Sequence, residues 1–498
     1  MSSIHVIYGR EAADIPADGG GTLLSVLRAA GYTLPAACGG KGRCGKCRVR
    51  VNGVPRLACR VTPRDGDEVI LPESGGGRIL TESVRIDAHS PRGESGLAAA
   101  VDLGTTTVAV RVYGLADGRE LGTRGAWNAQ APYGADVISR IEYALSSPGH
   151  ARELTGVIRR QTEELLRSII ADAGADVREL RRTVLCGNTV MQHLFAGLPV
   201  AGLAKAPFAP ETLFCEDFPD EILGAPLVYA PCVAGYVGGD IVSGLLASGV
   251  YRMPGENLFL DIGTNGEIVL GGMAGLCCCA VASGPAFEGA GVSHGMPAQD
   301  GAVSHVRYEH GFLCDVLGGG EPRGICGSGL CDLVAALCDC DVISPGGRLL
   351  PPGEVPLEMR RYLTCDENGN GVFHLSEEVS LTAGDVRALQ VAKAAVAGGI
   401  SVLTALRGIE PQALDSLCLA GGFGSFLSPR SAERIGMLPH LPHERIHTFG
   451  NTALAGASVL ALEPERLAVA RKIAGSCKYV ELSGRRDFAE AFAGSMGF

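Results

Sequence analysis

The stretch AACGGKGRCGKCRVRVNGVPRLAC, residues 36–59, places four cysteines within a short span of chain. Cys38, Cys44 and Cys47 follow the spacing C-x5-C-x2-C, and Cys59 comes a dozen positions later. Glycines separate the first three cysteines, and glycine tolerates positive φ and a close approach of the backbone. The pattern therefore predicts a tight loop that turns three thiols toward a common point, where the fourth joins them.

This spacing is close to the plant-type C-x4-C-x2-C…C ligand pattern of a [2Fe–2S] cluster, in which each iron takes two thiolates. Basic residues would offset the charge of the thiolates. They are Lys41, Arg43, Lys46 and Arg48. A zinc site usually shows two C-x2-C pairs, and a disulfide framework suits a small secreted domain. We therefore expect a [2Fe–2S] cluster. Its predicted ligands are Cys38, Cys44, Cys47 and Cys59.

The flanking residues predict a small domain over residues 1–74. A strand near the N-terminus precedes a short amphipathic helix that begins at Thr22 and ends near Gly31. Alternating Val49 and Val51 indicate a strand, and Asn52-Gly53 is a typical hairpin turn. The order of strand, helix, cysteine loop and strands resembles a β-grasp ferredoxin domain.

Length and composition limit the remaining choices. The 498 residues predict about three domains, and 43 Lys and Arg against 54 Asp and Glu give a net charge of −11. This charge argues against broad nucleic-acid binding. Neither a membrane-spanning apolar run nor a signal peptide is evident in the sequence. The 18 cysteines then indicate reduced thiols in a cytoplasm that we expect to be anoxic.

After a Gly-, Ser- and charge-rich linker over residues 75–97, short apolar strands alternate with long helices, a pattern typical of α/β architecture. We expect two further units, residues 98–255 and 256–498. Three segments in them pair a strand with a glycine-rich turn. They are LAAAVDLGTTTVAVRVYG (97–114), NLFLDIGTNGEIVLGG (257–272) and LCLAGGFGSFLSP (417–429).

In the first two segments an aspartate, Asp102 or Asp261, comes just before the turn. Backbone N–H groups and threonine hydroxyls can surround phosphate oxygens, and the acid can hold Mg²⁺ directly or through water. The turn residues that we expect to contact nucleotide are Gly104, Thr105, Thr106 and Thr107, then Gly263, Thr264, Asn265 and Gly266, then Gly421, Gly422, Gly424 and Ser425. One such hairpin alone is often an ordinary turn, but two followed by G-G-x-G are far more specific.

The three segments together resemble the actin, sugar-kinase and acetate-kinase ATPase superfamily. The resemblance implies two ribonuclease-H-like subdomains, each giving one phosphate hairpin, with Mg·ATP bound between them. It implies that Asp102 and Asp261 lie near Mg²⁺ and that the third segment lies at the adenosine. We assign catalytic roles to these two aspartates and also to Asp240 and Glu267, although an N-cap role would equally suit Asp240.

A ferredoxin domain joined to such an ATPase core resembles the reductive activators of corrinoid-dependent methyltransferases. Further segments fit that family. They are CGNTVMQHLFAG (186–197), VAGYVGGDIVSGLLA (233–247), ASGPAFEGAGVSHGM (282–296), GICGSGLCDLV (324–334) and GDVRALQVAKAAVAGGI (384–400). The resemblance implies ATP-dependent transfer of one electron to a Co(II) corrinoid protein, restoring Co(I). It also implies a low-potential electron donor as a second partner, and a homodimer is one assembly left open.

Several residues keep two interpretations. Glu288, Asn188 and Thr189 suit either nucleotide contacts or turns, and Gln390 and Lys393 suit either nucleotide contacts or a solvated helix face. The cysteines at 326–340 fit a buried helix better than a second cluster.

Three other functions also remain open. One is a plain electron-transfer or redox-sensing protein whose core binds nucleotide without turnover. A small-molecule kinase with an accessory [2Fe–2S] domain would phosphorylate an acid or a sugar. An activator of another low-potential enzyme would use the same parts, although such activators normally hold a [4Fe–4S] cluster between subunits.

Overall fold

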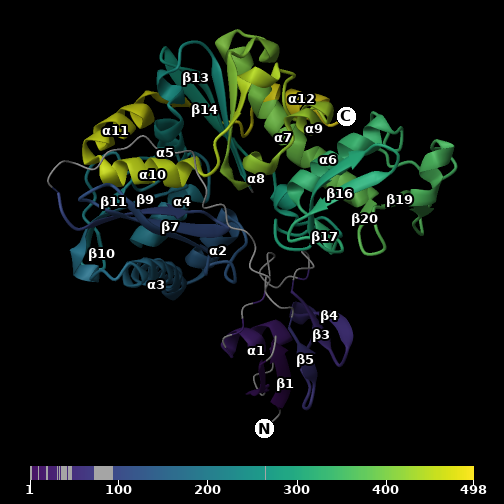
Figure 1. Cartoon of the computed structure of the whole chain (residues 1–498), viewed down its shortest axis with the longest axis horizontal. Helices are drawn as coiled ribbons and strands as arrows, with labels where there is room; N and C mark the ends of the chain where they lie inside the picture. Colours follow the sequence, from purple (N-terminus) through teal and green to yellow (C-terminus); the bar gives the residue numbers. More distant parts are fainter. Residues whose placement is uncertain are drawn as a thin grey trace.

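The computed structural model describes residues 3–8, 11–17, 21–30, 32, 34, 42, 47–71, 94–263 and 265–498. Cys38, Cys44, Thr264 and most of the expected linker lie outside the described residues. Figure 1 shows a small N-terminal domain, two large sheets with their helices, and a further lobe that carries α6, β16 and β19.

The N-terminal domain is a five-stranded mixed sheet in the order β2-β1-β5-β3-β4, with one helix packed on it. Its elements are β1 (Ser3–Tyr8), β2 (Glu11–Pro16), α1 (Leu23–Ala29), β3 (Arg48–Val51), β4 (Val54–Leu57), η1 (Ala58–Arg60) and β5 (Glu68–Ile70). The Thr22 side chain caps α1, and Leu23, Leu24 and Leu27 bury its apolar face. Both the predicted helix and the hairpin turn at residues 52–53 are confirmed.

The first large sheet has the order β10-β11-β9-β6-β7-β8. Its strands are β6 (Leu97–Leu103), β7 (Thr107–Gly114), β8 (Glu120–Trp127), β9 (Leu180–Gly187), β10 (Glu221–Ile222) and β11 (Ala225–Tyr229). β6, β7 and β8 form an antiparallel meander, and β9 and β11 continue the sheet in parallel with β6. Its helices are α2 (Val137–Ser146), α3 (Pro148–Asp172), α4 (Thr189–Ala196) and α5 (Gly239–Ser248).

The second large sheet repeats this plan in the order β22-β21-β12-β13-β14-β23. Its strands are β12 (Asn257–Ile262), β13 (Gly266–Gly272), β14 (Gly275–Val281), β21 (Ser416–Ala420), β22 (Ile446–Thr448) and β23 (Cys477–Tyr479). The antiparallel meander is β12-β13-β14, and β21 and β22 extend it in parallel. Five strands correspond in the two sheets, β11-β9-β6-β7-β8 and β22-β21-β12-β13-β14, whereas the sixth strands, β10 and β23, lie at opposite edges. The shared five-strand arrangement matches the predicted pair of ribonuclease-H-like subdomains.

Helices α7 (Ala383–Arg407), α8 (Gly421–Phe426), α9 (Pro429–Arg434), α10 (Thr452–Leu462), α11 (Leu467–Ser476) and α12 (Arg486–Gly494) accompany the second sheet. The further lobe is inserted between β14 and α7. It contains β15 (Ala302–Tyr308), β16 (Phe312–Val316), β17 (Gly324–Ile325), α6 (Gly327–Asp339), β18 (Leu363–Cys365), β19 (Gly371–His374) and β20 (Ser380–Thr382). One buried apolar cluster joins this lobe to the second sheet.

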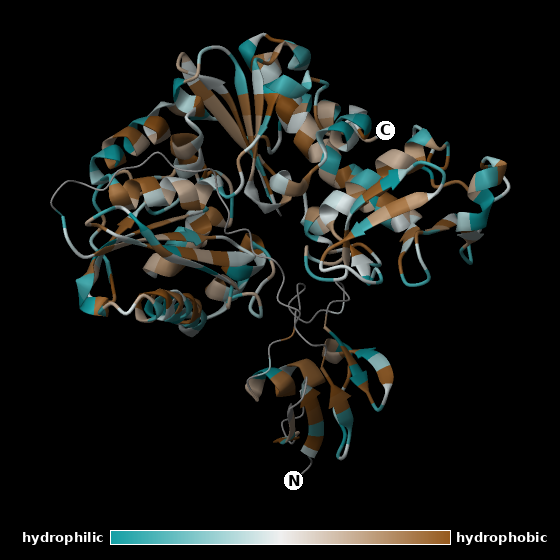
Figure 2. Cartoon of the chain, viewed as in Figure 1, coloured by the Kyte–Doolittle hydropathy of each residue, from teal (hydrophilic) through white to brown (hydrophobic). Residues whose placement is uncertain are grey.

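Helices α5 and α10 lie between the two large sheets, in a core to which both sheets contribute. Small residues allow the two helices to pack closely, because a Cβ on Gly456 would collide with the backbone of Ser243. Figure 2 shows hydrophobic residues along the strands of the sheets and hydrophilic residues on α3. This close packing fixes the N-terminal ends of α5 and α10. Asp240 lies at the first of these ends and Asn451 at the second.

Among the described residues, α7 is the one helix that is long and apolar enough to cross a membrane. Its most apolar window is 72% buried, and the helix packs on β13, β14 and α12. The spacing of Thr382 and Asp385 in the sequence is typical of a capping box at a helix start, and the structure contains this capping box at the start of α7. We therefore identify α7 as a core helix.

Candidate functional site

Two of the four predicted cluster ligands lie side by side in the N-terminal domain. Cys47 comes directly before β3 and Cys59 lies in η1, and their side chains are buried. The Ala58 N–H donates to the Cys47 carbonyl at 2.7 Å, which joins the two segments. Burial raises the pKa of the Cys47 thiol, and a hydrogen bond with the Cys59 thiol acts in the same direction. A nearby metal cation would be needed to hold these buried groups as thiolates.

Arg28 lies near this pair, and Arg60 lies near Gly42. Burial lowers the pKa of Arg28 on α1, while its electrostatic interaction with Cys47 and Cys59 opposes that change. Its Nε and Nη2 atoms are buried and have no hydrogen-bond partner among the described residues. Gly42 has φ +72°, and a Cβ there would collide with the Arg60 guanidinium. Two guanidinium nitrogens beside two thiols, without a partner among the described residues, fit an anionic iron–sulfur cluster with its sulfide acceptors.

The two predicted phosphate hairpins are present at corresponding places in the two sheets. Asp102 lies near the end of β6, and residues 104–106 turn the chain into β7. Asp261 lies near the end of β12, and Gly263 and Asn265 lie between that strand and β13. Both aspartates therefore lie near the end of a strand, just before a turn that contains glycine.

The third predicted loop meets the second hairpin. Gly421 begins α8 directly after β21 and has φ +76°, a conformation that favours glycine. A Cβ on Gly421 would collide with the Asp261 carboxylate, so this glycine permits the contact. The Phe423 ring stacks on Phe287 with centroids 4.5 Å apart, and Gly422 is exposed with open space beside it. Of the predicted adenosine residues, Ser425 bonds back to the Gly421 carbonyl at 2.7 Å.

Asp102, Asp240, Asp261 and Glu267 interact electrostatically with one another where the two large sheets meet. Burial, then repulsion from Asp261 and Asp102, raises the pKa of Asp240 to about 8. Burial, then Asp102, raises the pKa of Asp261 to about 7, and burial raises that of Asp102 to about 6. The pKa of Glu267 on β13 is also raised well above its usual value, by burial and by Asp240 and Asp261. Such mutual repulsion favours a bound cation.

Asp240 does not cap its helix. Gly238 is the N-cap of α5, and Asp240 lies in the first turn with its Oδ1 accepting from the Ile241 N–H at 2.8 Å. The N-cap interpretation of the sequence is therefore wrong. Asp102 instead accepts a hydrogen bond from Asn451 Nδ2 at 2.8 Å. Because Asn451 also caps α10, the first hairpin is tied to the helix that follows β22 of the second sheet.

The carboxylates do not form a complete metal site by themselves. Among the residues that the structure describes, no three His, Cys, Asp or Glu side chains are placed to hold a metal ion. Mg²⁺ commonly binds through one or two carboxylates, several waters and the phosphates of its substrate. The carboxylate group therefore fits a Mg²⁺ ion that arrives with a nucleotide.

Several contacts around the first hairpin were not predicted from the sequence. Arg140 on α2 is fully buried and donates to the Thr105 carbonyl at 2.6 Å. Asn188 caps α4 and donates to the Thr105 hydroxyl at 3.0 Å. The Thr106 hydroxyl donates to Glu288 at 3.0 Å, across 182 positions of chain. No local pattern marks Arg140, since its role depends on the packing of α2 against the hairpin.

Gln390 and Lys393 are neither solvated nor among the predicted nucleotide loops. Both are buried on α7, at 3% and 1% exposure. Gln390 Nε2 donates to the Met496 carbonyl at 2.6 Å, and the Lys393 ammonium donates to the Gly497 carbonyl. These side chains hold the C-terminal residues against α7. The sequence did not predict this contact because it joins positions more than a hundred residues apart.

Comparison with protein families gives three adjoining matches. Residues 8–68 match the 2Fe-2S iron-sulfur cluster binding domain, residues 97–253 match the RACo middle region, and residues 256–498 match the C-terminal domain of RACo, described as the ASKHA domain. These matches confirm the predicted fold class, a ferredoxin domain followed by an actin-like ATPase core. They also support the predicted [2Fe–2S] cluster and ATP as cofactors.

Similar proteins point the same way. The corrinoid activation enzyme RamQ of Eubacterium limosum is 32% identical over 412 residues, which cover 79% of this chain and 69% of the relative. A reductase of the methylated amine-specific Co(II) corrinoid protein from Methanosarcina barkeri is 25% identical over 406 residues, 74% of this chain and 70% of the relative.

Among solved structures, a reductive activator for a corrinoid, iron–sulfur protein matches 100% of this chain and 98% of its own, with 27% identity and a TM-score of 0.72. The structural match thus covers the ferredoxin domain of this chain as well as its ATPase core. With the relatives above, this result confirms the family that the sequence resembles. The chain belongs to the RACo family of corrinoid-activating proteins.

Proposed function

We propose that this protein is an ATP-dependent reductive activator that passes one electron to the Co(II) corrinoid of a partner protein and so restores Co(I). The observation that carries the proposal is the presence, in one chain, of a buried cysteine pair in a ferredoxin fold and a carboxylate-lined nucleotide site. RamQ is a corrinoid activation enzyme and the Methanosarcina protein is a reductase of a Co(II) corrinoid protein, which supports a corrinoid protein as the partner.

The cluster-binding residues in this proposal are Cys38, Cys44, Cys47 and Cys59. The [2Fe–2S] cluster that they hold supplies a carrier for one electron at a time. Arg28 and Arg60 place positive charge beside it, which favours the reduced and more negative form. The electron enters from a low-potential donor and leaves to cobalt, so donor and corrinoid change by one electron each.

The nucleotide residues divide into three groups. The hairpin residues 104–107 and 263–266 hold phosphate oxygens through N–H and hydroxyl groups. Asp102 and Asp261 bind Mg²⁺ directly or through water, while Asp240 and Glu267 orient water around it. Gly421, Gly422, Gly424 and Ser425 face the adenosine, where the exposed Gly422 leaves room for a ring.

Energy coupling follows from the position of the site between two sheets. A ligand shifts a conformational equilibrium only through its different affinities for the two states. Mg·ATP contacts both hairpins, so it favours the arrangement of the sheets in which both grip the phosphates. If the affinity for the Co(II) partner differs between this arrangement and the other, ATP binding and hydrolysis drive association or dissociation of the partner. Reduction that is uphill for the cluster alone can then proceed.

The test is anaerobic and uses the full chain with its cluster reconstituted. The chain is reduced and mixed with a Co(II) corrinoid protein, and Co(I) absorbance is followed with and without Mg·ATP. The proposal predicts Co(I) only when Mg·ATP is present. If an intact cluster and bound ATP gave no Co(I) with a panel of corrinoid proteins, the proposed function would be wrong.

A further inference from the structure

Glu288 lies between the two phosphate hairpins. Its carboxylate accepts a hydrogen bond from the Thr106 hydroxyl of the first hairpin at 3.0 Å. A Cβ built on Gly263 of the second hairpin would lie 3.9 Å from the same carboxylate oxygen. One anionic group of this chain therefore reaches both of the turns that we propose to bind phosphate.

The surroundings of Glu288 favour an anion. Arg140 holds the first hairpin through the Thr105 carbonyl, and its other acceptors include the Gly134 carbonyl at 2.9 Å and the Gln130 side-chain oxygen at 3.3 Å. These acceptors are all uncharged. Burial lowers the pKa of Arg140 to about 10, and Asp136 and Glu288 act against that change through their charge. The buried guanidinium thus interacts favourably with the charge of the Glu288 carboxylate.

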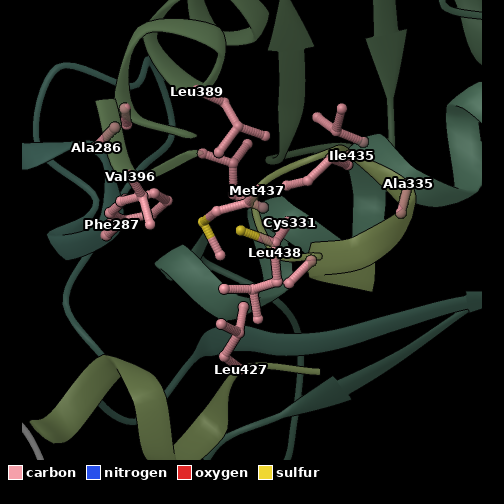
Figure 3. Packing of buried hydrophobic residues seen from close by; sticks show 14 of the residues in the cluster. Ala286, Phe287, Cys331, Ala335, Leu389, Val396, Leu427, Ile435, Met437 and Leu438 are labelled. Atoms are coloured by element: carbon pink, nitrogen blue, oxygen red, sulfur yellow. The ribbon is translucent and has the colours of Figure 1, made fainter. Parts of the chain in front are cut away.

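The segment that carries Glu288 is firmly anchored on its other side. Glu288 ends the short 3-10 helix η5 (Pro285–Glu288), in which Ala286 and Phe287 are buried. Figure 3 shows Ala286 and Phe287 in the apolar cluster with Val396 and Leu389 of α7, and η5 packs on α7 and on α6. Phe287 also stacks on Phe423 of the third nucleotide loop. A displacement of Glu288 would therefore also disturb the packing of η5 on α6, a helix of the further lobe.

We propose that Glu288 competes with a nucleotide phosphate for the Thr106 hydroxyl and for the space between the two hairpins. The carboxylate resembles a phosphate in charge and in its oxygen acceptors, so both groups suit the same donors. ATP binding must then break the contact between Thr106 and Glu288 and move the carboxylate away. This inference rests on the proposed binding of Mg·ATP at the hairpins and assigns Glu288 as a residue that sets the affinity for phosphate.

The two variants Glu288→Ala and Glu288→Gln test the competition. The first removes the carboxylate, and the second keeps its size but removes its charge, so it preserves the packing of η5. The matched control is Glu358→Gln, which alters an exposed glutamate in another 3-10 helix, η6 (Leu357–Tyr362). Binding of Mg·ATP and of adenosine is measured by calorimetry on the full chain with its cluster reconstituted under anaerobic conditions.

The proposal predicts that Glu288→Ala binds Mg·ATP roughly tenfold more tightly than the unaltered chain, the factor expected when about 1.4 kcal/mol of competition is removed. Glu288→Gln should fall between the two, and Glu358→Gln should match the unaltered chain. Adenosine, which has no phosphate, should show no change in affinity in any of them. This split between ATP and adenosine would not arise from a merely structural role of Glu288.

Unchanged or weaker ATP binding by both Glu288 variants would overturn the competition. Weaker binding together with loss of ATP hydrolysis would assign Glu288 instead to positioning water or Mg²⁺ at the phosphate. If the unaltered chain itself did not bind Mg·ATP, both the proposed function and this inference would fail. If it binds ATP and the variants do not differ from it, only this inference fails. Should Glu288→Ala not fold, the near-isosteric Glu288→Gln decides the question.

Discussion

The cluster site and the nucleotide site of this protein differ in the sign of their charge. Basic residues predominate at the first, and carboxylates predominate at the second. In the N-terminal domain, Arg28 lies beside two buried thiols, and its Nε and Nη2 have no hydrogen-bond partner in the part of the chain that the structure describes. Residues 1–74 contain ten Lys and Arg against seven Asp and Glu. In the ATPase core, four carboxylates repel one another between the two sheets, in a chain with a net charge of −11. The first site accepts an anionic cluster and the second a cation with its nucleotide. The difference lets one substitution disable one site while sparing the other.

The largest effect should come from the cluster ligands. Cys59→Ala removes one of the four thiolates that the two irons need. We expect it to abolish both the cluster absorbance and Co(I) formation while leaving the affinity for Mg·ATP unchanged. The exposed Cys365 provides the matched control, and Cys365→Ala should retain both the cluster absorbance and Co(I) formation. Retention of a full cluster by Cys59→Ala would show that the ligand set is different.

The reverse separation is expected for Asp261→Asn. The carboxylate contacts the third loop at Gly421 and lies near Asp240, so its loss should raise the Mg²⁺ concentration needed for ATP-dependent reduction by roughly 10- to 100-fold. The cluster should remain intact by absorbance and electron paramagnetic resonance. The control is Asp366→Asn, which alters an exposed turn. Full ATP-driven reduction by Asp261→Asn at the normal Mg²⁺ concentration would contradict the coupling.

A smaller effect should appear as a pH dependence of stability. The folded-state pKa of Asp240, about 8, lies above the ordinary aspartate value of 3.8. Its stabilising contribution is therefore complete below about pH 4 and is lost as the pH rises through 8. Asp240→Asn stays neutral, so between pH 5 and pH 8 its free energy of unfolding should rise relative to the parent by at least ~1.4 kcal/mol, one pKa unit's worth.

Denaturant unfolding of both proteins at several pH values, without Mg²⁺, measures this difference. Added Mg·ATP should reduce it, because a bound cation stabilises the ionised carboxylates of the parent. A difference in stability that stays constant between pH 5 and pH 8 would mean that Asp240 does not hold its proton in the folded chain.

The smallest effect is expected at Arg28. Arg28→Gln removes a positive charge beside Cys47 and Cys59, which should lower the reduction potential of the cluster. We expect a shift of tens of millivolts, since about 59 mV corresponds to tenfold for one electron. The exposed Arg56 on β4 gives the control variant Arg56→Gln. An equal potential in both variants would remove Arg28 from the account of the cluster.

Local patterns in the sequence predicted much of this arrangement. The cysteine spacing, the hairpins after Asp102 and Asp261 and the capping box at Thr382 are all set by neighbouring residues, so they can be recognised in one stretch of chain. The same reasoning failed at Asp240, where Gly238 takes the cap because the close packing of α5 on residues 187–188 leaves no room for a Cβ at that position.

Contacts between distant segments could not be predicted in this way. Arg140, Asn451 and Glu288 reach the first hairpin from elements that follow it by tens to hundreds of residues. Their chemistry is ordinary for a helix, a cap and a turn. Only the folded arrangement shows that a buried arginine, an amide and a carboxylate meet the same few turn residues.

We propose that Mg·ATP drives one electron from the ferredoxin domain of this chain to the corrinoid of its partner. Stopped-flow spectroscopy of the reduced chain mixed with a Co(II) corrinoid protein follows cluster oxidation and Co(I) formation in the same sample. We expect Mg·ATP to start both changes together, with one Co(I) formed for each cluster oxidised, and neither change to occur without it. Equal rates of Co(I) formation with and without Mg·ATP would show that ATP does not drive the electron transfer.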